Sequence, residues 1–395
     1  MRISYFSGCA LSICVAAAFL AGCGGSQAPV TVAPVTATTQ ATHTRPAITF
    51  QTLHSFGSNN DGESPESALI EVNGTLYGTT PLGGLHDFGT VYSISKTGTE
   101  TVLHSFSGPD GDSPGGGALL DVNGTLDGTT RFGGAHGKGT VYTIDATGNE
   151  NVVHSFDGDN GAHPDGALIS KNDALYGTTT YGGRYDRGIV YVKRSYKFFK
   201  GHDFGLGYDG ASPTAGLTNV NGDPLFGTTI RGGVADGGTV YSLFNNGTEQ
   251  VVHYFGLGSD GKTPFAGVLG VKGTLYGTTN AGGAHGSGTV YRIAQGVETV
   301  LHSFGGGSDG KDPIAGVTEM NGELYGTTEL GGAHDEGTVY RISTTGAETV
   351  VYSFGSGDND GKHPYAGLLK INDTLYGTTT SGGMAGWGTV FSLKP

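Results

Sequence analysis

Acidic and imidazole side chains recur at a regular spacing, and they are the residues best suited to chemistry. Aspartate precedes glycine in six equivalent loops, and Asn160 takes its place in the seventh; the aspartates are Asp61, Asp110, Asp209, Asp260, Asp309 and Asp360. Histidine follows a Gly-Gly pair in four other loops, at His86, His136, His285 and His334. These groups could bind sugar hydroxyls, a cation or a basic partner. Asp before Gly is also typical of tight turns, so a purely structural role is the alternative.

Recognisable catalytic motifs are absent from the sequence. It has no Gly-x-Ser-x-Gly elbow, phosphate-binding loop or His-Glu-x-x-His motif. We therefore expect no catalytic residue, no cofactor and no bound metal, and we favour a binding module for a glycan or a protein. A polysaccharide-processing hydrolase or lyase is the first alternative, and it would require unrepeated carboxylates that converge at one place. A purely structural envelope protein is the second.

Residues that break the repeat are further candidates for function. The single tryptophan, Trp387, could stack on a sugar ring. Residues 184–200 hold a basic segment in a chain of formal net charge −14; it consists of Arg184, Arg187, Lys193, Arg194, Lys197 and Lys200. This segment could bind an anionic glycan, a phosphate group or an acidic protein. Alternatively, its lysines lie on a solvated outer edge and discourage pairing with other strands.

A repeating unit must position all these residues. Leu-Tyr-Gly-Thr-Thr or a close variant occurs seven times, with its glycine at 78, 128, 177, 227, 277, 326 and 377. The first unit predicts strands over 67–72, 75–80, 89–94 and 100–106, with an Asn73-Gly74 hairpin turn between the first two. Seven such units without a helical pattern predict an all-β, seven-bladed propeller over residues 47–395. An open β-solenoid is the alternative, and it would require distinctive capping units.

The two ends of the repeat region indicate how the ring closes. Residues 48–56 match a fourth strand and residues 388–393 match a third strand, so we expect the N-terminal strand to complete the last blade. The loops between second and third strands should share one face with the inter-blade loops, where propeller ligands usually bind. Histidines in the fourth strands should be structural; simple alternation places His104 on the same side as Val102 and Phe106.

The repeated motifs Leu-Tyr-Gly-Thr-Thr, Gly-Gly, Gly-Thr-Val-Tyr and His-Ser-Phe resemble the GloVer-type tandem repeat of exported bacterial proteins. The resemblance covers nearly the whole of residues 47–395. It implies an exported, propeller-like protein and brings no particular reaction with it.

The N-terminus has the features of a targeting segment. Arg2 precedes an apolar run that ends in Leu20-Ala21-Gly22-Cys23, which resembles the lipobox of bacterial lipoproteins. This resemblance implies a signal peptide over 1–22, acylation of Cys23 with fatty acids such as palmitate, and a flexible tether over 23–46. We expect a monomer anchored by lipid in the bacterial cell envelope, at the outer membrane or cell surface. An ordinary secretory signal is the alternative, and the acidic charge disfavours nucleic acid as a partner.

Overall fold

The computed structural model describes residues 48–57, 60–195 and 197–395. The signal peptide, Cys23 and the tether predicted from the sequence lie outside the described residues. Every regular element in the described part of the chain is a β-strand. None of the described residues belongs to a helix that could cross a bilayer.

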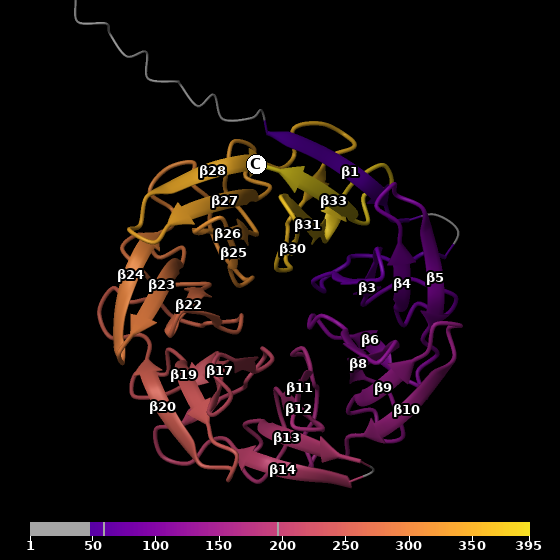
Figure 1. The fold of residues 1–395 in the computed structure, drawn as a ribbon, viewed down its shortest axis with the longest axis vertical. Helices are drawn as coiled ribbons and strands as arrows, with labels where there is room; N and C mark the ends of the chain where they lie inside the picture. The colour runs from indigo at the N-terminus through magenta and orange to yellow at the C-terminus, as the bar shows by residue number, and fades with distance from the viewer. Residues whose placement is uncertain (1–47, 58–59, 196) are drawn as a thin grey trace, which may run out of the picture. The chain divides into compact units, whose positions relative to one another are not determined.

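Seven antiparallel sheets of four main strands are arranged as the blades of a propeller around a common centre (Figure 1). Blade 1 contains β2 (Ile70–Val72), β3 (Thr75–Thr80), β4 (Thr90–Ile94) and β5 (Glu100–Ser105), in order from the centre to the rim. Its first strand is shorter than the sequence predicts. Where the ladder would continue, the Ser67 hydroxyl accepts a hydrogen bond from the Thr79 N–H at 2.9 Å.

Five further blades repeat this strand order. Blade 2 has β7 (Leu120–Val122), β8 (Thr125–Phe132), β9 (Thr140–Ile144) and β10 (Glu150–Ser155), and blade 3 has β11 (Ile169–Lys171), β12 (Ala174–Thr179), β13 (Ile189–Arg194) and β14 (Lys197–Asp203). Blade 4 has β16 (Thr218–Asn219), β17 (Leu225–Thr229), β19 (Thr239–Leu243) and β20 (Glu249–Tyr254), and blade 5 has β21 (Leu269–Val271), β22 (Thr274–Thr279), β23 (Thr289–Ala294) and β24 (Val297–Ser303). Blade 6 has β25 (Thr318–Met320), β26 (Glu323–Thr328), β27 (Thr338–Ser343) and β28 (Glu348–Ser353).

Three of the inter-blade loops contain a short strand. One of these strands joins the sheet of blade 2, and the other two belong to separate two-stranded sheets. β6 (Asp112–Pro114) pairs with β8, β15 (Gly210–Ala211) pairs with β18 (Arg231–Gly232), and β29 (Gly361–Lys362) pairs with β32 (Ser381–Gly382). β15 and β29 thereby tie two inter-blade loops to the loop between the second and third strands of the same blade, and β6 ties a third to β8.

The seventh blade joins the two ends of the propeller. It consists of β30 (Leu369–Ile371), β31 (Thr374–Thr379), β33 (Thr389–Lys394) and, as its outermost strand, β1 (Thr49–Ser55). β1 pairs antiparallel with β33 from Thr49 opposite Lys394 to Ser55 opposite Thr389. The closure predicted from the sequence is therefore confirmed, and an open solenoid is excluded.

The hydrophobic core lies between neighbouring blades. A phenylalanine at the end of each outer strand is fully buried, and its ring meets an aromatic ring in the third strand of the next blade. Phe106 meets Tyr142 edge-on, with ring centroids 5.0 Å apart. Edge-to-face aromatic pairs of this kind contribute about 0.5–1.5 kcal/mol beyond the burial of their area. Seven such contacts hold the blades together around the ring.

The glycine of Leu-Tyr-Gly-Thr-Thr is explained by the tyrosine of the neighbouring strand. A Cβ atom on Gly78 would lie only 2.5 Å from the hydroxyl oxygen of Tyr92. Tyr92 is fully buried and lies across the strand pair from Gly78. The same close approach recurs in the other blades, so the repeat retains glycine wherever the aromatic ring covers the second strand.

Each outer strand contains a β-bulge, so some of its side chains point to the opposite face of the sheet from the one that the sequence predicts. In blade 1, Val102 lies opposite Tyr92 and His104 lies opposite Val91, so Leu103 is the extra residue. Tyr92 and Val91 point to opposite faces of the sheet. The prediction that His104 and Val102 share a side is therefore wrong, because the bulge interrupts the alternation. His104 does share its side with Phe106, as predicted; their ring centroids are 4.9 Å apart.

Candidate functional site

The loop aspartates are paired with the histidines of the outer strands. The Nε2–Oδ2 distances are 3.2 Å for His54–Asp61, 2.9 Å for His104–Asp110, 3.3 Å for His202–Asp209, 3.3 Å for His253–Asp260 and 2.8 Å for His302–Asp309. In the remaining aspartate loop, the Tyr352 hydroxyl donates to Asp360 at 3.0 Å. The aspartates also accept backbone N–H groups, as Asp61 does from Gly57 at 3.0 Å. They thus stabilise the loops and the outer strands, and none of them lines the central cavity described below.

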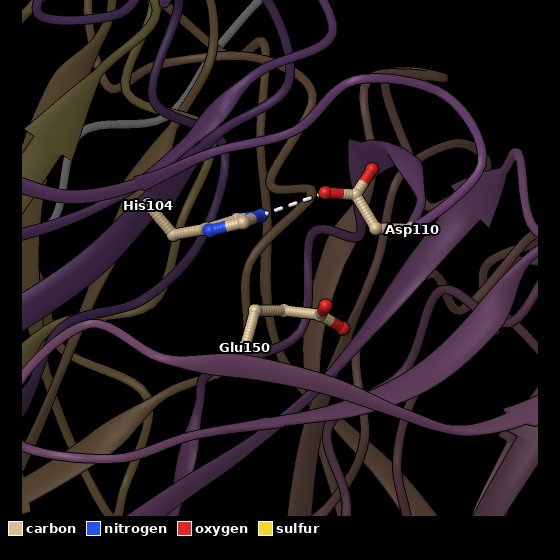
Figure 2. A group of neighbouring side chains, drawn as sticks. All are labelled: His104, Asp110 and Glu150. Carbon is tan, nitrogen blue, oxygen red and sulfur yellow. Dashed lines mark hydrogen bonds and ion pairs between the residues drawn. The ribbon is translucent and has the colours of Figure 1, made fainter.

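A glutamate from the next blade completes this arrangement at five of the seven junctions. Figure 2 shows His104, Asp110 and Glu150, whose potential ligand atoms all lie within 4.8 Å of one another. Burial, and secondarily the charge of Asp110, raises the pKa of Glu150 to about 7. The equivalent glutamates are Glu100, Glu249, Glu298 and Glu348, and burial likewise raises the pKa of each to about 7. This donor set would suit a cation, and it is the one group of this kind found among the described residues. The same three residue types recur at the four other junctions, which indicates a role in blade packing.

An aromatic ring replaces the glutamate at the two other junctions. Phe198 of blade 3 stacks on His154 of blade 2, with ring centroids 3.9 Å apart. Phe50 of blade 7 stacks on Tyr352 of blade 6, with ring centroids 3.8 Å apart. These rings fill the position that the glutamate carboxyl group occupies elsewhere.

The other residues singled out from the sequence lie away from the central cavity. His86, His136, His285 and His334 are all exposed. His285 lines a shallow cavity near His302 and Asp309. Trp387 is 46% exposed and lies so close to Gly57 that a Cβ there would be 2.5 Å from its ring. These residues do not converge on one site.

The basic segment lies on the outer part of blade 3. Arg184 and Arg187 are exposed, and the Arg184 guanidinium carbon is 5.4 Å from the centre of the Tyr185 ring. Lys200 forms an ion pair with Asp203 at 3.2 Å. Phe199, on the same outer strand, is 48% exposed. The segment is therefore an exposed rim surface, separate from the channel.

A cavity of about 180 Å³ lies where the inter-blade loops converge. In most blades, the residue that follows the loop proline lines this cavity. The residue type at this position differs from blade to blade, although the adjacent residues in the sequence repeat. Reading from blade 1 to blade 7, the position holds Glu66, Gly115, Asp165, Thr214, Phe265, Ile314 and Tyr365. Arg131, which follows Thr129-Thr130 in blade 2, adds a cation to the wall. We call this set, without Gly115, the channel mouth. No sequence motif predicts this set, although variation at one position of a constant repeat is a usable signal.

The polar half of the channel mouth is organised by Arg131. Its Nη1 lies 2.7 Å from Oε2 of Glu66, and its Nε donates to Oδ1 of Asp165 at 2.7 Å. Burial alone would lower the pKa of Arg131, but the charges of Asp165 and Glu66 outweigh it and hold the pKa above its usual range. The Gly116 N–H also donates to Asp165 at 2.9 Å. These contacts fix two carboxylates and one guanidinium at one side of the cavity.

The opposite half of the channel mouth is apolar and aromatic. Phe265, Ile314 and Tyr365 come from blades 5, 6 and 7, and all three are partly exposed to the cavity. Burial, together with the charge of Glu66, raises the pKa of Tyr365 to about 12, so its hydroxyl stays protonated at neutral pH. Thr214 of blade 4 separates the two halves.

A second cavity, of about 470 Å³, adjoins the channel mouth and shares Glu66 and Tyr365 with it. Glu329, His363 and Thr380 also line it. Burial raises the pKa of Glu329; the neighbouring carboxylates of Asp312 and Glu66 act in the same direction, and His363 opposes them. Glu329 therefore retains its proton to a higher pH than an ordinary glutamate.

Solved structures with the same fold have diverse functions. A lectin, BP39L from Burkholderia pseudomallei, is 9% identical with a TM-score of 0.55, covering 83% of this chain and 98% of the lectin. A puromycin-hydrolysing peptidase from Mycobacterium tuberculosis is 10% identical with a TM-score of 0.50, covering 81% of this chain and 51% of the peptidase. A gluconolactonase from Xanthomonas campestris is 14% identical with a TM-score of 0.45, covering 87% and 89%. Likeness at this level of identity concerns the fold alone.

Sequence comparison identifies the family. No curated protein sequence matches the chain. The Gloeobacter/Verrucomicrobia repeat matches it twice in tandem, over residues 37–191 and 192–391. These two matches include every blade, and they agree with the resemblance seen in the repeated motifs. The chain belongs to the Gloeobacter/Verrucomicrobia repeat family.

Proposed function

We propose that this protein is a binding module of the bacterial cell envelope that holds a saccharide at the channel mouth. The proposal rests on the difference in residue type between the two sides of the channel mouth. Blades 1 to 3 contribute Glu66, Arg131 and Asp165, whereas blades 5 to 7 contribute Phe265, Ile314 and Tyr365. A repeat that served only to build blades would have no reason to differ in this way from one side of the channel to the other.

A sugar ring has the chemistry that suits such a wall. Its hydroxyl groups can donate to carboxylates and accept from a guanidinium, while its C–H faces pack against aromatic rings. Arg131 is already paired with two carboxylates, so the polar half is not a strong site for a phosphate or a sulfate. The cavity of about 180 Å³ is smaller than the roughly 300–1,000 Å³ of typical ligand pockets. It suits one sugar unit or the end of a longer chain.

The location is a second part of the proposal. The lipobox-like run at residues 20–23 supports lipid anchoring through Cys23, and the tether would leave the propeller free to reach its ligand. Membrane lipid is then a permanent partner of the N-terminus. β1 closes the ring within a single chain, which supports a monomer as the binding unit.

A glycan array tests the binding proposal directly. The chain from residue 24 onward, which lacks the lipidation site, should bind a restricted set of saccharides. Phe265→Ala should weaken binding by at least about tenfold, or about 1.4 kcal/mol, because it removes one aromatic wall of the cavity. Phe199→Ala, which removes an exposed phenylalanine on the rim, is the matched control and should bind as wild type does.

The peripheral candidates are compared in the same assay. Trp387→Ala and His285→Ala test the exposed loops, and Arg184→Ala with Arg187→Ala tests the basic segment. Loss of binding in these variants, with Phe265→Ala unaffected, would contradict the assignment to the channel mouth. The salt dependence of the affinity distinguishes the basic segment from the other sites. Binding to the basic segment would weaken as the ionic strength rises, because salt screens its charges.

A further inference from the structure

The cavity beside the channel mouth contains two carboxyl groups in different environments. Glu66 lies in an ion pair, with its Oε2 2.7 Å from Nη1 of Arg131. Glu329 has no comparable ion pair among the described residues. Its burial and the neighbouring carboxylates of Asp312 and Glu66 favour the protonated form. The cavity wall therefore holds one carboxyl group that is paired with a guanidinium and one that has no such ion pair among the described residues.

Neither glutamate is required by the repeat. The position of Glu329 holds Pro81, Arg131, Thr180, Ile230, Asn280 and Thr380 in the other blades. The position of Glu66 is equally variable. Except for Asp165 at the Glu66 position of blade 3, the other blades form these turns and pack without a carboxyl group at either position. These two glutamates are therefore unlike the glutamates at the rim, which recur at five blade junctions.

The other polar residues of the cavity favour carboxylate chemistry over a serine nucleophile. His363 contacts Glu336 at 3.1 Å through Nε2 and the Glu329 carbonyl oxygen at 3.3 Å through Nδ1. Both ring nitrogens are thus engaged with groups other than serine. The Ser381 hydroxyl donates to the Lys362 carbonyl oxygen at 3.4 Å. Glycoside hydrolysis uses two carboxyl groups in different environments, and this cavity has such a pair beside the Tyr365 ring.

We propose that this second cavity hydrolyses a glycosidic bond, with Glu329 as the acid and Glu66 as the charged group that stabilises the transition state. This inference rests on the proposed binding of a saccharide at the adjoining channel mouth. Glu329 gives its proton to the glycosidic oxygen as the bond between that oxygen and the anomeric carbon breaks. The positive charge that develops on the sugar ring is stabilised by the Glu66 carboxylate.

Water then completes the reaction without another reactant. A water molecule adds to the anomeric carbon and loses a proton to the Glu329 carboxylate, which restores the acid. One glycoside and one water are consumed, and two hydroxyl-bearing sugars, or a sugar and an alcohol, are released. Arg131 acts as a positioning residue, because it holds Glu66 at the boundary of the two cavities.

Activated glycosides separate the roles of the two glutamates. The probes are 2,4-dinitrophenyl glycosides of glucose, galactose, mannose, xylose and N-acetylglucosamine in both anomeric forms, assayed at mildly acidic pH. Dinitrophenolate leaves without help from an acid, so Glu329→Gln should still release it, whereas Glu66→Gln should lose activity by on the order of 100-fold or more. Asn280→Gln, at the position of blade 5 that corresponds to Glu329, is the matched control and should retain full activity.

Two further measurements make the assignment specific. On the corresponding methyl glycoside, whose leaving group needs a proton, Glu329→Gln should lose on the order of 100-fold. Steady-state turnover of the dinitrophenyl glycoside by Glu329→Gln should be limited by water addition, because the carboxylate that accepts the proton of water is missing. Added azide should speed this step and yield a glycosyl azide, because azide attacks without giving up a proton. Circular dichroism of both variants should match wild type, which excludes misfolding as the cause.

The control for background release is the double variant Glu66→Gln, Glu329→Gln. If wild type releases dinitrophenolate no faster than this double variant, the inference is overturned. If the array still shows binding that depends on Phe265, only the hydrolysis is wrong and the proposed function stands. If the array shows no saccharide binding either, both proposals fail.

Discussion

The ring of Phe198 lies face to face on the imidazole of His154, with centroids 3.9 Å apart and planes 13° apart. At five other junctions a glutamate lies beside the histidine of the preceding blade, and there the histidine also has an aspartate partner. At the Phe198 junction the loop carries Asn160 instead of that aspartate. The blade junction can therefore be built with a charged cluster or with stacked rings. Because both kinds of junction occur in one protein, a substitution at one kind can be compared with a substitution at the other.

Phe198 should contribute more to stability than its neighbour Phe199. Phe198→Ala removes a partly buried ring together with its stacking on His154, so we expect a loss of about 1–3 kcal/mol. Phe199→Ala removes a ring that is 48% exposed and should cost less than about 1 kcal/mol. Chemical denaturation followed by tryptophan fluorescence or circular dichroism measures both. Equal losses would contradict a role for the stacked pair.

The rim glutamates should make stability depend on pH. The pKa of Glu150 rises from about 4.5 in the unfolded chain to about 7 in the folded protein, so folding favours the protonated form. Its contribution is fully present below about pH 4.5 and is lost as pH rises through about 7. Histidines whose pKa is lowered by burial, such as His253, act in the opposite direction, so whole-protein melting curves mix the two effects.

Glu150→Gln isolates the glutamate contribution, because glutamine is neutral at every pH. Relative to wild type, the variant should gain thermal stability as pH rises from about 5 to 8. Glu298→Gln, at another junction with the same composition, should show the same trend. A difference in melting temperature that stays constant across this range would contradict the raised pKa.

Removal of a buried tyrosine hydroxyl should be harmless. The Tyr241 hydroxyl has no hydrogen-bond partner among the described residues, and Phe391 occupies the same position in blade 7. We expect Tyr241→Phe to leave the free energy of unfolding unchanged or to increase it by up to about 1 kcal/mol. Tyr352→Phe is the matched comparison; its hydroxyl donates to Asp360 at 3.0 Å, so its loss should cost about 1 kcal/mol.

The N-terminal strand should be essential for a closed ring. A chain that begins at residue 57 lacks β1 and Phe56, which is fully buried between blades. We expect a loss of more than about 3 kcal/mol, or aggregation, because the outer edge of β33 becomes exposed. A chain that begins at residue 47 retains β1 and should melt as wild type does. Similar melting of the two truncated proteins would argue against closure through β1.

Lipid anchoring predicts a clear change in partitioning. Cys23→Ser should move the protein from the detergent phase to the aqueous phase in a phase-separation assay, because the lipidation site is lost. A conservative change elsewhere in the leader, such as Cys14→Ser, is the control and should leave the partitioning unchanged. Detergent partitioning of Cys23→Ser equal to wild type would rule out this anchor.

Local patterns in the sequence were sufficient to predict the blades. The Asn73-Gly74 turn joins two runs of β-forming residues, and both features are short-range, so they predict a hairpin without knowledge of the rest of the chain. Closure is also predicted, because residues 48–56 repeat the pattern of the outer strands of most other blades. A period of about 50 residues leaves few other folds in which each unit can bury its apolar faces.

Only the tertiary structure decided which side chains meet. His104 and Asp110 were predicted as separate groups, and the bulge at Leu103 brings them to the same junction by breaking the alternation of the strand. Glu66, Arg131 and Asp165 come from three blades and have no common motif, so no local pattern predicts their ion pairs. A repeated sequence specifies the contacts that every unit shares. The channel mouth depends on the positions at which the units differ, and their proximity exists only once the ring has closed.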